Sequence, residues 1–300
     1  MTLEQLRIFV AVAERQHVTR AAEALNLTQS AASAAIAALE ARHGSKLFNR
    51  VGRGIELTEA GRVFLDEARA VLARADMAEQ KLAELAGLKR GRLLIQASQT
   101  IASYWLPRRL VDFRRAYPGI EIKLSVGNTA DAAKAVNTGM AELGFIEGPI
   151  ESSQLKITEV ARDQLIVVVA ADHPWATRRK LNAEDLVQGE WVLREPGSGT
   201  RSVFEDALAQ LGVPASALNI VLELPTNEAV RAAVEAGMGA TALSASAAVS
   251  SLEAGLLSKV ALKLPARAFN LIQQIEREPS HAARALVAAV TGKPRNPKSK

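Results

Sequence analysis

The spacing of apolar side chains predicts two kinds of structure in the first ninety residues. Three segments carry apolar side chains every three or four positions, as amphipathic helices do, and these are 2–14, 18–25 and 28–42. Residues 46–58 alternate around a glycine-containing turn, which predicts two short strands. A helical pattern then runs unbroken from Thr58 to about residue 86. The order helix, turn, helix and strand pair predicts a winged helix-turn-helix in residues 1–58, followed by a linker helix in residues 59–90.

Strand and helix patterns alternate in the rest of the chain. Short apolar runs predict strands at 93–97, 121–126, 143–146, 165–170, 191–194, 221–224 and 269–275. Helical patterns between most of these runs predict a parallel sheet covered by helices, so the fold class is α+β with several domains. We expect residues 91–300 to form two α/β (Rossmann-like) subdomains with a cleft between them. The first comprises residues 91–162 and 266–292, the second 163–265, and 293–300 form a basic tail.

The predicted linker helix has an apolar seam. Its members alternate spacings of four and three, as in a heptad repeat, and they are Phe64, Ala68, Val71, Ala75, Ala78, Leu82 and Leu85. Two such helices can pair, so the seam predicts a homodimer. The alternative, that the helix packs on its own domain, stays open.

Composition excludes several classes of site. The chain has no cysteine, which excludes disulfides and thiolate metal sites, and its four histidines are scattered without ligand spacing. No apolar stretch is long enough to span a membrane, and the chain begins with an amphipathic pattern rather than a signal peptide. Neither a phosphate-binding P-loop nor a nucleophile elbow is present. We expect a soluble cytoplasmic protein without cofactor, metal or membrane, and not an enzyme.

Basic side chains gather where the predicted wing lies. The net charge is +5, and every charged residue from 42 to 53 is basic, whereas the middle of the chain is nearly neutral. In a helix-turn-helix the second helix enters the major groove of double-stranded DNA and a basic wing contacts phosphates. Gln29 can pair with adenine, and short hydroxyl side chains can reach bases or phosphates. The candidate DNA-binding residues are Thr19, Thr28, Gln29, Ser30, Ser33, Arg50 and Arg53.

Two segments of the predicted α/β halves can hold a ligand. Ser98, Gln99 and Thr100 start one helix, and Gly197, Ser198, Gly199 and Thr200 start another in the opposite half. Helix N-termini expose free N–H groups that favour negative charge, so together these segments can clamp a small anion. Asn128, Glu147 and Asn227 end strands or start helices beside the same cleft. The alternative, that these residues are ordinary caps and turns, stays open.

Several motifs of the chain resemble the LysR-type transcriptional regulators. They lie at 6–9, 18–22, 27–31, 39–40, 47–50 and 57–61. The resemblance implies a promoter-binding regulator whose effector domain resembles a periplasmic solute-binding protein, assembled as a homotetramer that is a dimer of dimers. The chain departs from the family at Ala34, where a large polar or basic side chain is frequent. Hence the family's base contacts are not carried over to this position.

Segments 98–101, 124–128, 144–149 and 193–201 resemble, within that family, regulators of sulfur assimilation and of carbon fixation. This resemblance implies a small anionic effector, either a sulfur oxyanion or a carboxylate or sugar phosphate. A solute-binding module without a transcriptional role is the alternative. The expected DNA-binding head and the absence of a signal peptide argue against it.

Overall fold

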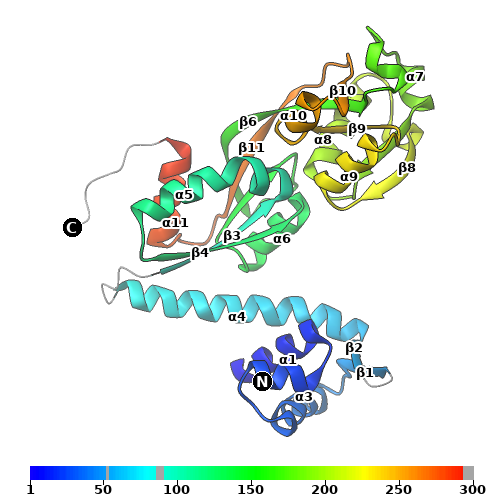
Figure 1. The fold of residues 1–300 in the computed structure, drawn as a ribbon. Helices are drawn as coiled ribbons and strands as arrows, with labels where there is room; N and C mark the ends of the chain where they lie inside the picture. Colours follow the sequence, from blue (N-terminus) through cyan, green and yellow to red (C-terminus); the bar gives the residue numbers. More distant parts are fainter. Residues whose placement is uncertain (52–53, 86–90, 293–300) are drawn as a thin grey trace. The chain divides into compact units, whose positions relative to one another are not determined.

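The chain forms two compact units, Met1–Ala86 and Gly87–Lys300, in a computed structural model (Figure 1). The structure describes residues 1–51, 54–85 and 91–292, apart from the side chains of residues 80, 81 and 83–85. The predicted wing residue Arg53, the end of the predicted linker and the basic tail lie outside the described residues. Each unit is described by itself.

The first unit has the elements that the sequence predicts for a winged helix-turn-helix. They are α1 (Leu3–Arg15), α2 (Val18–Ala24), α3 (Gln29–His43), β1 (Phe48–Val51), β2 (Gly54–Leu57) and α4 (Glu59–Leu85). The turn between α2 and α3 passes through Asn26, whose φ of 55° lies in the left-handed region that asparagine tolerates better than most residues. Gly44 ends α3 with a φ of 62°. The two strands pair antiparallel, with Phe48 opposite Leu57.

One aromatic side chain joins the helices of the first unit to its strands. Phe9 of α1 is completely buried, and its ring centroid lies 5.4 Å from that of Phe48 and 4.9 Å from that of Phe64. Burial of a side chain of this size contributes about 1.5–3 kcal/mol. Ala21, Ala22 and Ala32 are also buried, and their small size lets α1, α2 and α3 approach closely.

The apolar seam of α4 does not serve one purpose along its whole length. Phe64 and Ala68 pack into the core of their own unit, so the prediction that they face a partner is wrong. α1 offers them an apolar surface within the same chain, where Phe9 contacts Phe64. Further along, Val71 is 42% exposed and Leu82 is 69% exposed. The side chain of Leu85 lies outside the described residues.

The second unit is a mixed sheet with helices on both faces (Figure 1). Its strands are β3 (Gly91–Ser98), β4 (Ile120–Gly127), β5 (Leu143–Glu147), β6 (Leu155–Ala170), β7 (Glu190–Arg194), β8 (Asn219–Leu224), β9 (Ala240–Ser244), β10 (Leu257–Lys259) and β11 (Ala266–Gln274). Its helices are η1 (Ile101–Trp105), α5 (Leu106–Ala116), α6 (Thr129–Thr138), η2 (Pro174–Thr177), α7 (Ala183–Gln188), α8 (Gly199–Gln210), η3 (Ala215–Ala217), α9 (Asn227–Glu235), α10 (Ala245–Glu253) and α11 (His281–Thr291). The strand order is β4-β3-β5-β11-β6-β9-β7-β8, and β10 pairs with β6.

Two long antiparallel strands connect the halves of the second unit. β6 and β11 pair from Gln164 opposite Ala266 to Leu155 opposite Gln274. The prediction of an all-parallel sheet is therefore wrong, because β11 and β6 run against their neighbours. The predicted strand 165–170 is only the apolar end of β6. The first part of β6 alternates polar and apolar residues because it is partly exposed, and the search for continuous apolar runs missed it.

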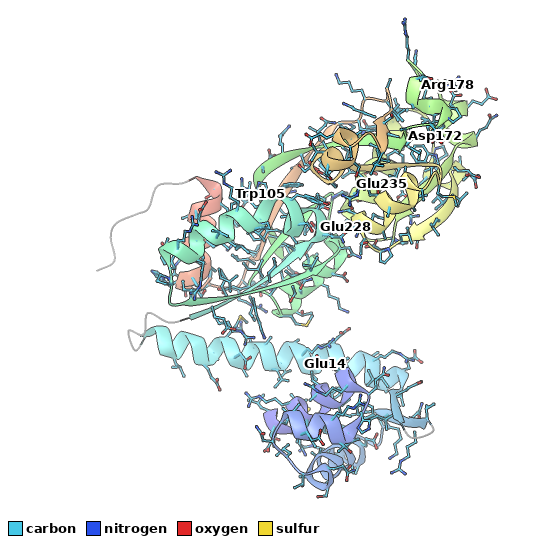
Figure 2. All side chains as sticks on the ribbon, viewed as in Figure 1. Glu14, Trp105, Asp172, Arg178, Glu228 and Glu235 are labelled. Atoms are coloured by element: carbon cyan, nitrogen blue, oxygen red, sulfur yellow. The ribbon has the colours of Figure 1, made fainter. Side chains whose placement is uncertain are left out.

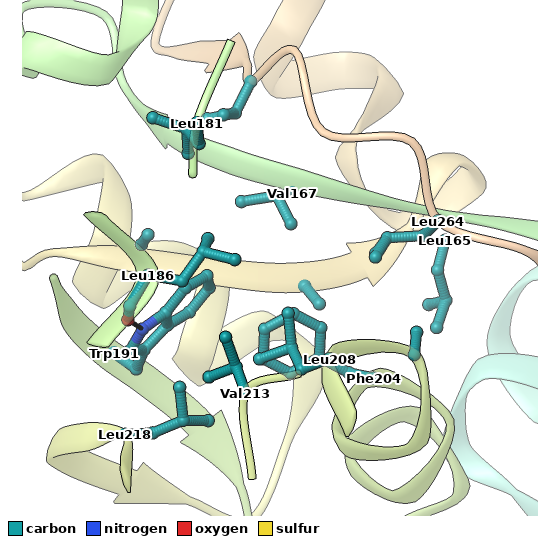
Figure 3. Close-up of a cluster of buried hydrophobic side chains, with 14 of the residues drawn as sticks. Leu165, Val167, Leu181, Leu186, Trp191, Phe204, Leu208, Val213, Leu218 and Leu264 are labelled. Atoms are coloured by element: carbon teal, nitrogen blue, oxygen red, sulfur yellow. Dashed lines mark hydrogen bonds between the residues drawn. The ribbon is translucent and has the colours of Figure 1, made fainter. Parts of the chain in front are cut away.

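The sheet is buried on both faces where it crosses the second half. Leu165, Val167 and Val169 of β6 pack on one face with α8, whereas Ile166 and Val168 pack on the other with α9 and α10. This explains the continuous apolar run in the sequence. On the first face, the indole N–H of Trp191 donates to the Leu186 carbonyl at 2.8 Å (Figure 3). β9 and α10 were not predicted, because their alanine-rich sequence carries little strand or helix periodicity.

Candidate DNA interface and effector site

Polar side chains gather at the start of α3, the second helix of the helix-turn-helix. The Thr28 hydroxyl accepts the Ala31 N–H at 3.2 Å, so Thr28 is the helix cap. It also lies 3.1 Å from the Ser30 hydroxyl. Gln29 Nε2 donates to Ser33 Oγ at 2.9 Å, and Gln29 and Ser30 are exposed whereas Ser33 is half-buried. The first turn of α3 therefore presents an amide and two hydroxyls, the groups that bind bases and phosphates.

Between its first and last turns, the exposed face of α3 is made of small apolar residues, and the exposed Arg42 and His43 lie in its last turn. Ala32, Ile36 and Leu39 face the core, and the opposite face carries Ala34, Ala37, Ala38 and Ala41. Such side chains do not hinder a close approach to another molecule, but they donate and accept no hydrogen bonds. Any polar contact from this helix must therefore come from its first turn or from Arg42 and His43 in its last turn.

Two other predicted DNA-binding residues lie on neighbouring elements. Arg50 is exposed on β1 opposite Ile55 of β2, and Thr19 is exposed in the first turn of α2. Both side chains are accessible to a ligand.

A half-buried carboxylate joins the end of α3 to the strands. Glu40 Oε1 accepts the N–H groups of Leu47 at 2.8 Å and Phe48 at 3.3 Å, and Glu40 Oε2 lies 2.6 Å from Lys46 Nζ. Burial by itself would raise the pKa of Glu40, but the Lys46 ammonium and the two N–H groups outweigh it and hold the pKa below its ordinary value. Glu40 therefore fixes the position of the strands relative to α3. The sequence analysis did not single it out.

In the second unit, the predicted residues Ser98 and Glu147 meet at the carboxyl ends of two parallel strands, β3 and β5. The Ser98 hydroxyl donates to Glu147 Oε2, and both residues are at least 98% buried. Thr129 Oγ1 donates to the Glu147 backbone carbonyl at 2.6 Å. Thr100 makes no side-chain cap to the following helix, and the Ser98 hydroxyl binds a carboxylate.

An arginine from the crossing strand β11 joins this carboxylate to the other half. Arg267 is buried, its Nε lies 2.8 Å from Asp163 Oδ2, and its Nη1 donates to Thr200 Oγ1 at 2.9 Å. Its Nη1 is also 3.9 Å from Glu147 Oε1, and its Nη2 lies 2.8 Å from Asp163 Oδ2 but not at a hydrogen-bonding angle. Ser244 Oγ donates to Asp163 Oδ1 at 2.7 Å. These contacts place a cation between two buried carboxylates.

A second set of buried contacts links the halves through Thr100 and Asn227. Asn227 Nδ2 donates to Thr100 Oγ1 at 3.1 Å, and the hydroxyls of Thr100 and Thr200 are 3.5 Å apart. Arg194 Nη1 donates to Asn227 Oδ1 at 2.9 Å. We call seven of the residues in these contacts the buried junction: Ser98, Thr100, Glu147, Asp163, Thr200, Asn227 and Arg267.

Next to the buried junction, the Gln99 side chain makes two hydrogen bonds to the first turn of α9. Its Oε1 accepts the Asn227 N–H at 2.6 Å, and its Nε2 donates to Glu228 Oε2 at 2.9 Å. The Tyr104 hydroxyl donates to Glu228 Oε1 at 3.1 Å, and Glu228 is labelled in Figure 2. Burial and the neighbouring Glu228 carboxylate raise the pKa of Tyr104. Gln99 thus occupies the backbone N–H at the start of α9.

The predicted glycine loop brings the two halves into backbone contact. Gly197 has a φ of +88°, and its carbonyl accepts the Ala130 N–H at 3.3 Å. A Cβ on Gly199 would lie 1.8 Å from the Glu147 carbonyl oxygen, so only glycine allows this approach. Ser198 starts α8, is buried, and makes no side-chain cap. Asn128 caps α6 and also reaches Glu195 Oε1 with its Nδ2 at 3.3 Å.

Three charged residues of this region were missed from the sequence: Asp163, Arg194 and Arg267. A signal was present for two of them. Arg267 lies two positions before Phe269 and four before Leu271 on the same strand, and both of these side chains are buried. Asp163 lies two positions before the buried Leu165. Side chains two apart on a strand share a face, so these charges were predictable on the core side. Nothing in the sequence indicated that they would contact each other.

Two kinds of site were not found in the part of the chain that the structure describes. None of its helices has both the length and the apolarity needed to cross a membrane. Its histidines and carboxylates form no group of three or more that could hold a metal ion.

Family models and known proteins agree on the two units. Residues 3–62 match the family described as "Bacterial regulatory helix-turn-helix protein, lysR family", and residues 86–294 match the LysR substrate binding domain. The chain is 37% identical over 286 residues to the uncharacterized HTH-type transcriptional regulator YeiE of Escherichia coli K12, covering 95% of this chain and 94% of that protein.

Solved structures of similar fold include full-length regulators. The LysR family transcriptional regulator CbnR matches with a TM-score of 0.71 at 23% identity, over 97% of this chain and 98% of that one. The regulatory domain of CcmR from Synechocystis PCC6803, solved in complex with 2-PG, matches with a TM-score of 0.62 at 25% identity, over 69% of this chain and 99% of that one. With a helix-turn-helix unit followed by a LysR substrate-binding domain, the chain belongs to the LysR family of bacterial transcriptional regulators.

Proposed function

We propose that this regulator binds promoter DNA through α3 and the β1–β2 wing and responds to a small anionic effector at the buried junction. The proposal assigns no catalysis, and it places the protein in the cytoplasm, where the chromosome lies. The observation that carries it is the convergence of Thr100, Thr200, Asn227 and Arg267, which come from both halves and bring hydroxyl, amide and guanidinium groups together. Such donors are the groups that bind oxyanions.

The contacts across the buried junction explain how an effector would act. In this structure the groups from the two halves bind each other, as Thr100 binds Asn227 and Thr200. An effector that takes over some of these hydrogen bonds changes how the halves pack. A ligand shifts such an equilibrium only through a difference in its affinity for the two arrangements.

The exposed part of the α4 seam supports a role in assembly. Val71 and Leu82 are exposed apolar residues on one helix, and Ala75 and Ala78 lie between them at heptad spacing. Pairing of this seam with a second copy would bury these side chains and give two DNA-binding units related by a twofold axis, as two half-sites require. A dimer of dimers is the assembly that we propose.

Two classes of effector fit this proposal: a sulfur oxyanion, or a carboxylate or sugar phosphate. The complex of the similar CcmR domain with 2-PG supports the second class. A thermal-shift screen of sulfite, sulfate, thiosulfate, acetylserine and sugar phosphates would distinguish them, because a ligand that binds only the folded state raises its melting temperature.

The test of the proposed function measures DNA binding and effector response separately. A duplex selected from a random library by the purified full-length protein is titrated with and without the effector from the screen. We expect specific binding and an effector-dependent change in affinity. In a Ser98→Ala, Thr100→Ala double variant the response should disappear while the DNA is still bound. Absence of any sequence-selective binding would refute the regulator, whereas a full response in the double variant would refute the effector site.

A further inference from the structure

Glu147 and Ser98 can accept hydrogen bonds from a ligand at the buried junction but have no hydrogen left to donate to it. The Ser98 hydroxyl has one hydrogen, and it donates that hydrogen to Glu147 Oε2. An ionised carboxylate accepts hydrogen bonds but donates none. Glu147 Oε1 lies 3.9 Å from Arg267 Nη1, beyond hydrogen-bond distance. A ligand that contacts these two side chains must therefore supply the hydrogen itself.

Other groups of the buried junction have hydrogens to donate. Arg267 Nη2 is buried and makes no hydrogen bond in the described structure, although it lies 2.8 Å from Asp163 Oδ2. Thr100 accepts from Asn227 and Thr200 accepts from Arg267, so one of the two threonine hydrogens joins the hydroxyl pair and the other is left. Asn227 Nδ2 has a second hydrogen beyond the one it gives Thr100. A ligand here needs oxygen lone pairs.

The buried charges do not favour a fully deprotonated anion. Arg267 is already matched by Asp163, and Arg194 is paired with Glu195 at 2.8 Å. Glu147 therefore adds a negative charge with no full partner of its own. An anion without a hydrogen would place its lone pairs against those of Glu147 in a site where water cannot screen them, which is costly.

We infer that Glu147 makes the buried junction selective for a small oxyanion that carries an O–H group, such as hydrogen phosphate, over one that carries none, such as sulfate. The ligand's O–H donates to Glu147, and its other oxygens accept from Arg267, one threonine hydroxyl and Asn227. This inference rests on the proposed effector site and names the chemical class of its ligand. Glu147 is thus a specificity-determining residue.

Inorganic phosphate and sulfate are the probes that test this inference. They have similar size and the same tetrahedral shape, but at neutral pH phosphate keeps at least one proton and sulfate keeps none. Isothermal titration calorimetry of the full-length protein, at matched ionic strength, measures both affinities directly. Calorimetry avoids the general stabilisation that both salts give in melting experiments. A hydrogen bond to a charged group predicts that phosphate binds about tenfold to a hundredfold more tightly.

Variants at one position separate the effect of Glu147 from that of the fold. In Glu147→Gln the amide can donate to sulfate, so the ratio of the two affinities should fall towards one. Glu147→Asp keeps the carboxylate and should keep a preference for phosphate. Glu121→Gln removes an exposed carboxylate of β4 and should leave the wild-type ratio unchanged. Circular dichroism of each variant without anion establishes that it is folded.

Each possible result decides the question. Equal affinities in the wild type would overturn the inference but leave the anion site of the proposed function in place, and this measurement needs no variant. A wild-type ratio in a folded Glu147→Gln protein would also overturn it. If neither anion binds, the inference fails, and the screen of sulfur compounds, acetylserine and sugar phosphates tests the anionic effector by itself. DNA binding by the same preparation then tests separately whether the protein is a DNA-binding regulator.

Discussion

The two units of this protein hold their candidate functional side chains in opposite surroundings. In the first unit, Gln29 and Ser30 are exposed neighbours on one helix, above a core made of apolar side chains. In the second unit, Arg267 is buried and binds partners that lie 104 and 67 residues away in the sequence. The exposed set can be altered without disturbing its scaffold. The buried set contributes to the stability of the fold as well as to any binding that occurs there.

The physical cause of this difference is the cost of removing charge from water. A buried ion pair whose partner is removed leaves an uncompensated charge, whereas an exposed side chain is simply replaced by solvent. Substitutions at the buried junction should therefore change stability and ligand response together. Substitutions on the DNA face should change affinity alone. Four predictions test this contrast, from the largest expected effect to the smallest.

The largest effect is expected for Arg267→Ala. It leaves Asp163 and Glu147 buried without their cation, and breaking a buried pair in this way costs about 3–5 kcal/mol. Denaturant unfolding of the full-length protein measures the loss. The matched control is Arg162→Ala, which removes an exposed arginine of β6 and should leave the unfolding midpoint unchanged. Equal midpoints for the two variants would contradict the contrast between the units.

Gly199→Ala should have the next largest effect. The added methyl would lie 1.8 Å from the Glu147 carbonyl, so α8 must move away from β5. Overpacking of this kind costs about 1–3 kcal/mol, and the displacement should also weaken effector binding. Thermal unfolding and calorimetry check both effects. Ser202→Ala, one turn along α8, is the control. A Gly199→Ala protein with wild-type stability and response would show that the halves need not approach so closely.

Glu40→Gln tests the half-buried carboxylate that joins α3 to the strands of the first unit. The neutral amide still accepts hydrogen bonds from Leu47 and Phe48 but loses the charge, at a cost of about 1 kcal/mol at neutral pH. Because folding lowers the pKa of Glu40, its contribution is present above the unfolded-state pKa and is lost as pH falls through the folded-state pKa. The difference between wild type and variant should therefore vanish in acid.

Unfolding curves from neutral to acidic pH measure this difference. Glu56→Gln, an exposed position of β2, is the control and should follow the wild type at each pH. A Glu40→Gln deficit that persists unchanged in acid would mean that the charge of Glu40 does not stabilise the strands.

Arg50→Ala should leave stability unchanged and affect DNA binding alone. Removal of one phosphate contact lowers the slope of log affinity against log salt concentration by about 1. Fluorescence anisotropy at several salt concentrations gives the slope. Lys123→Ala, which removes a cation from β4 of the second unit, should keep the wild-type slope. If Arg50→Ala also keeps the wild-type slope, then Arg50 does not contact phosphate.

The sequence was most informative where function depends on neighbouring residues. The helical and strand periods of residues 2–86 predicted every element of the first unit. In the second unit, the hydroxyls of Ser98 and Thr100 were predicted beside the cleft, but their partners were not. Glu147 was named only as a possible lining residue. Its bond to Ser98 joins positions 49 residues apart, which no local pattern reports.

What the sequence determined by itself is therefore the set of local elements and the family to which they belong. Helix periods, strand alternation and caps act between residues a few positions apart, so they can be read along the chain. The tertiary structure alone decided that β6 and β11 cross between the halves, that Phe64 and Ala68 turn into their own core, and that Arg267 lies between two carboxylates. The reason is physical: strand pairing and the desolvation of charge depend on which distant segments meet, and only the folded chain brings them together.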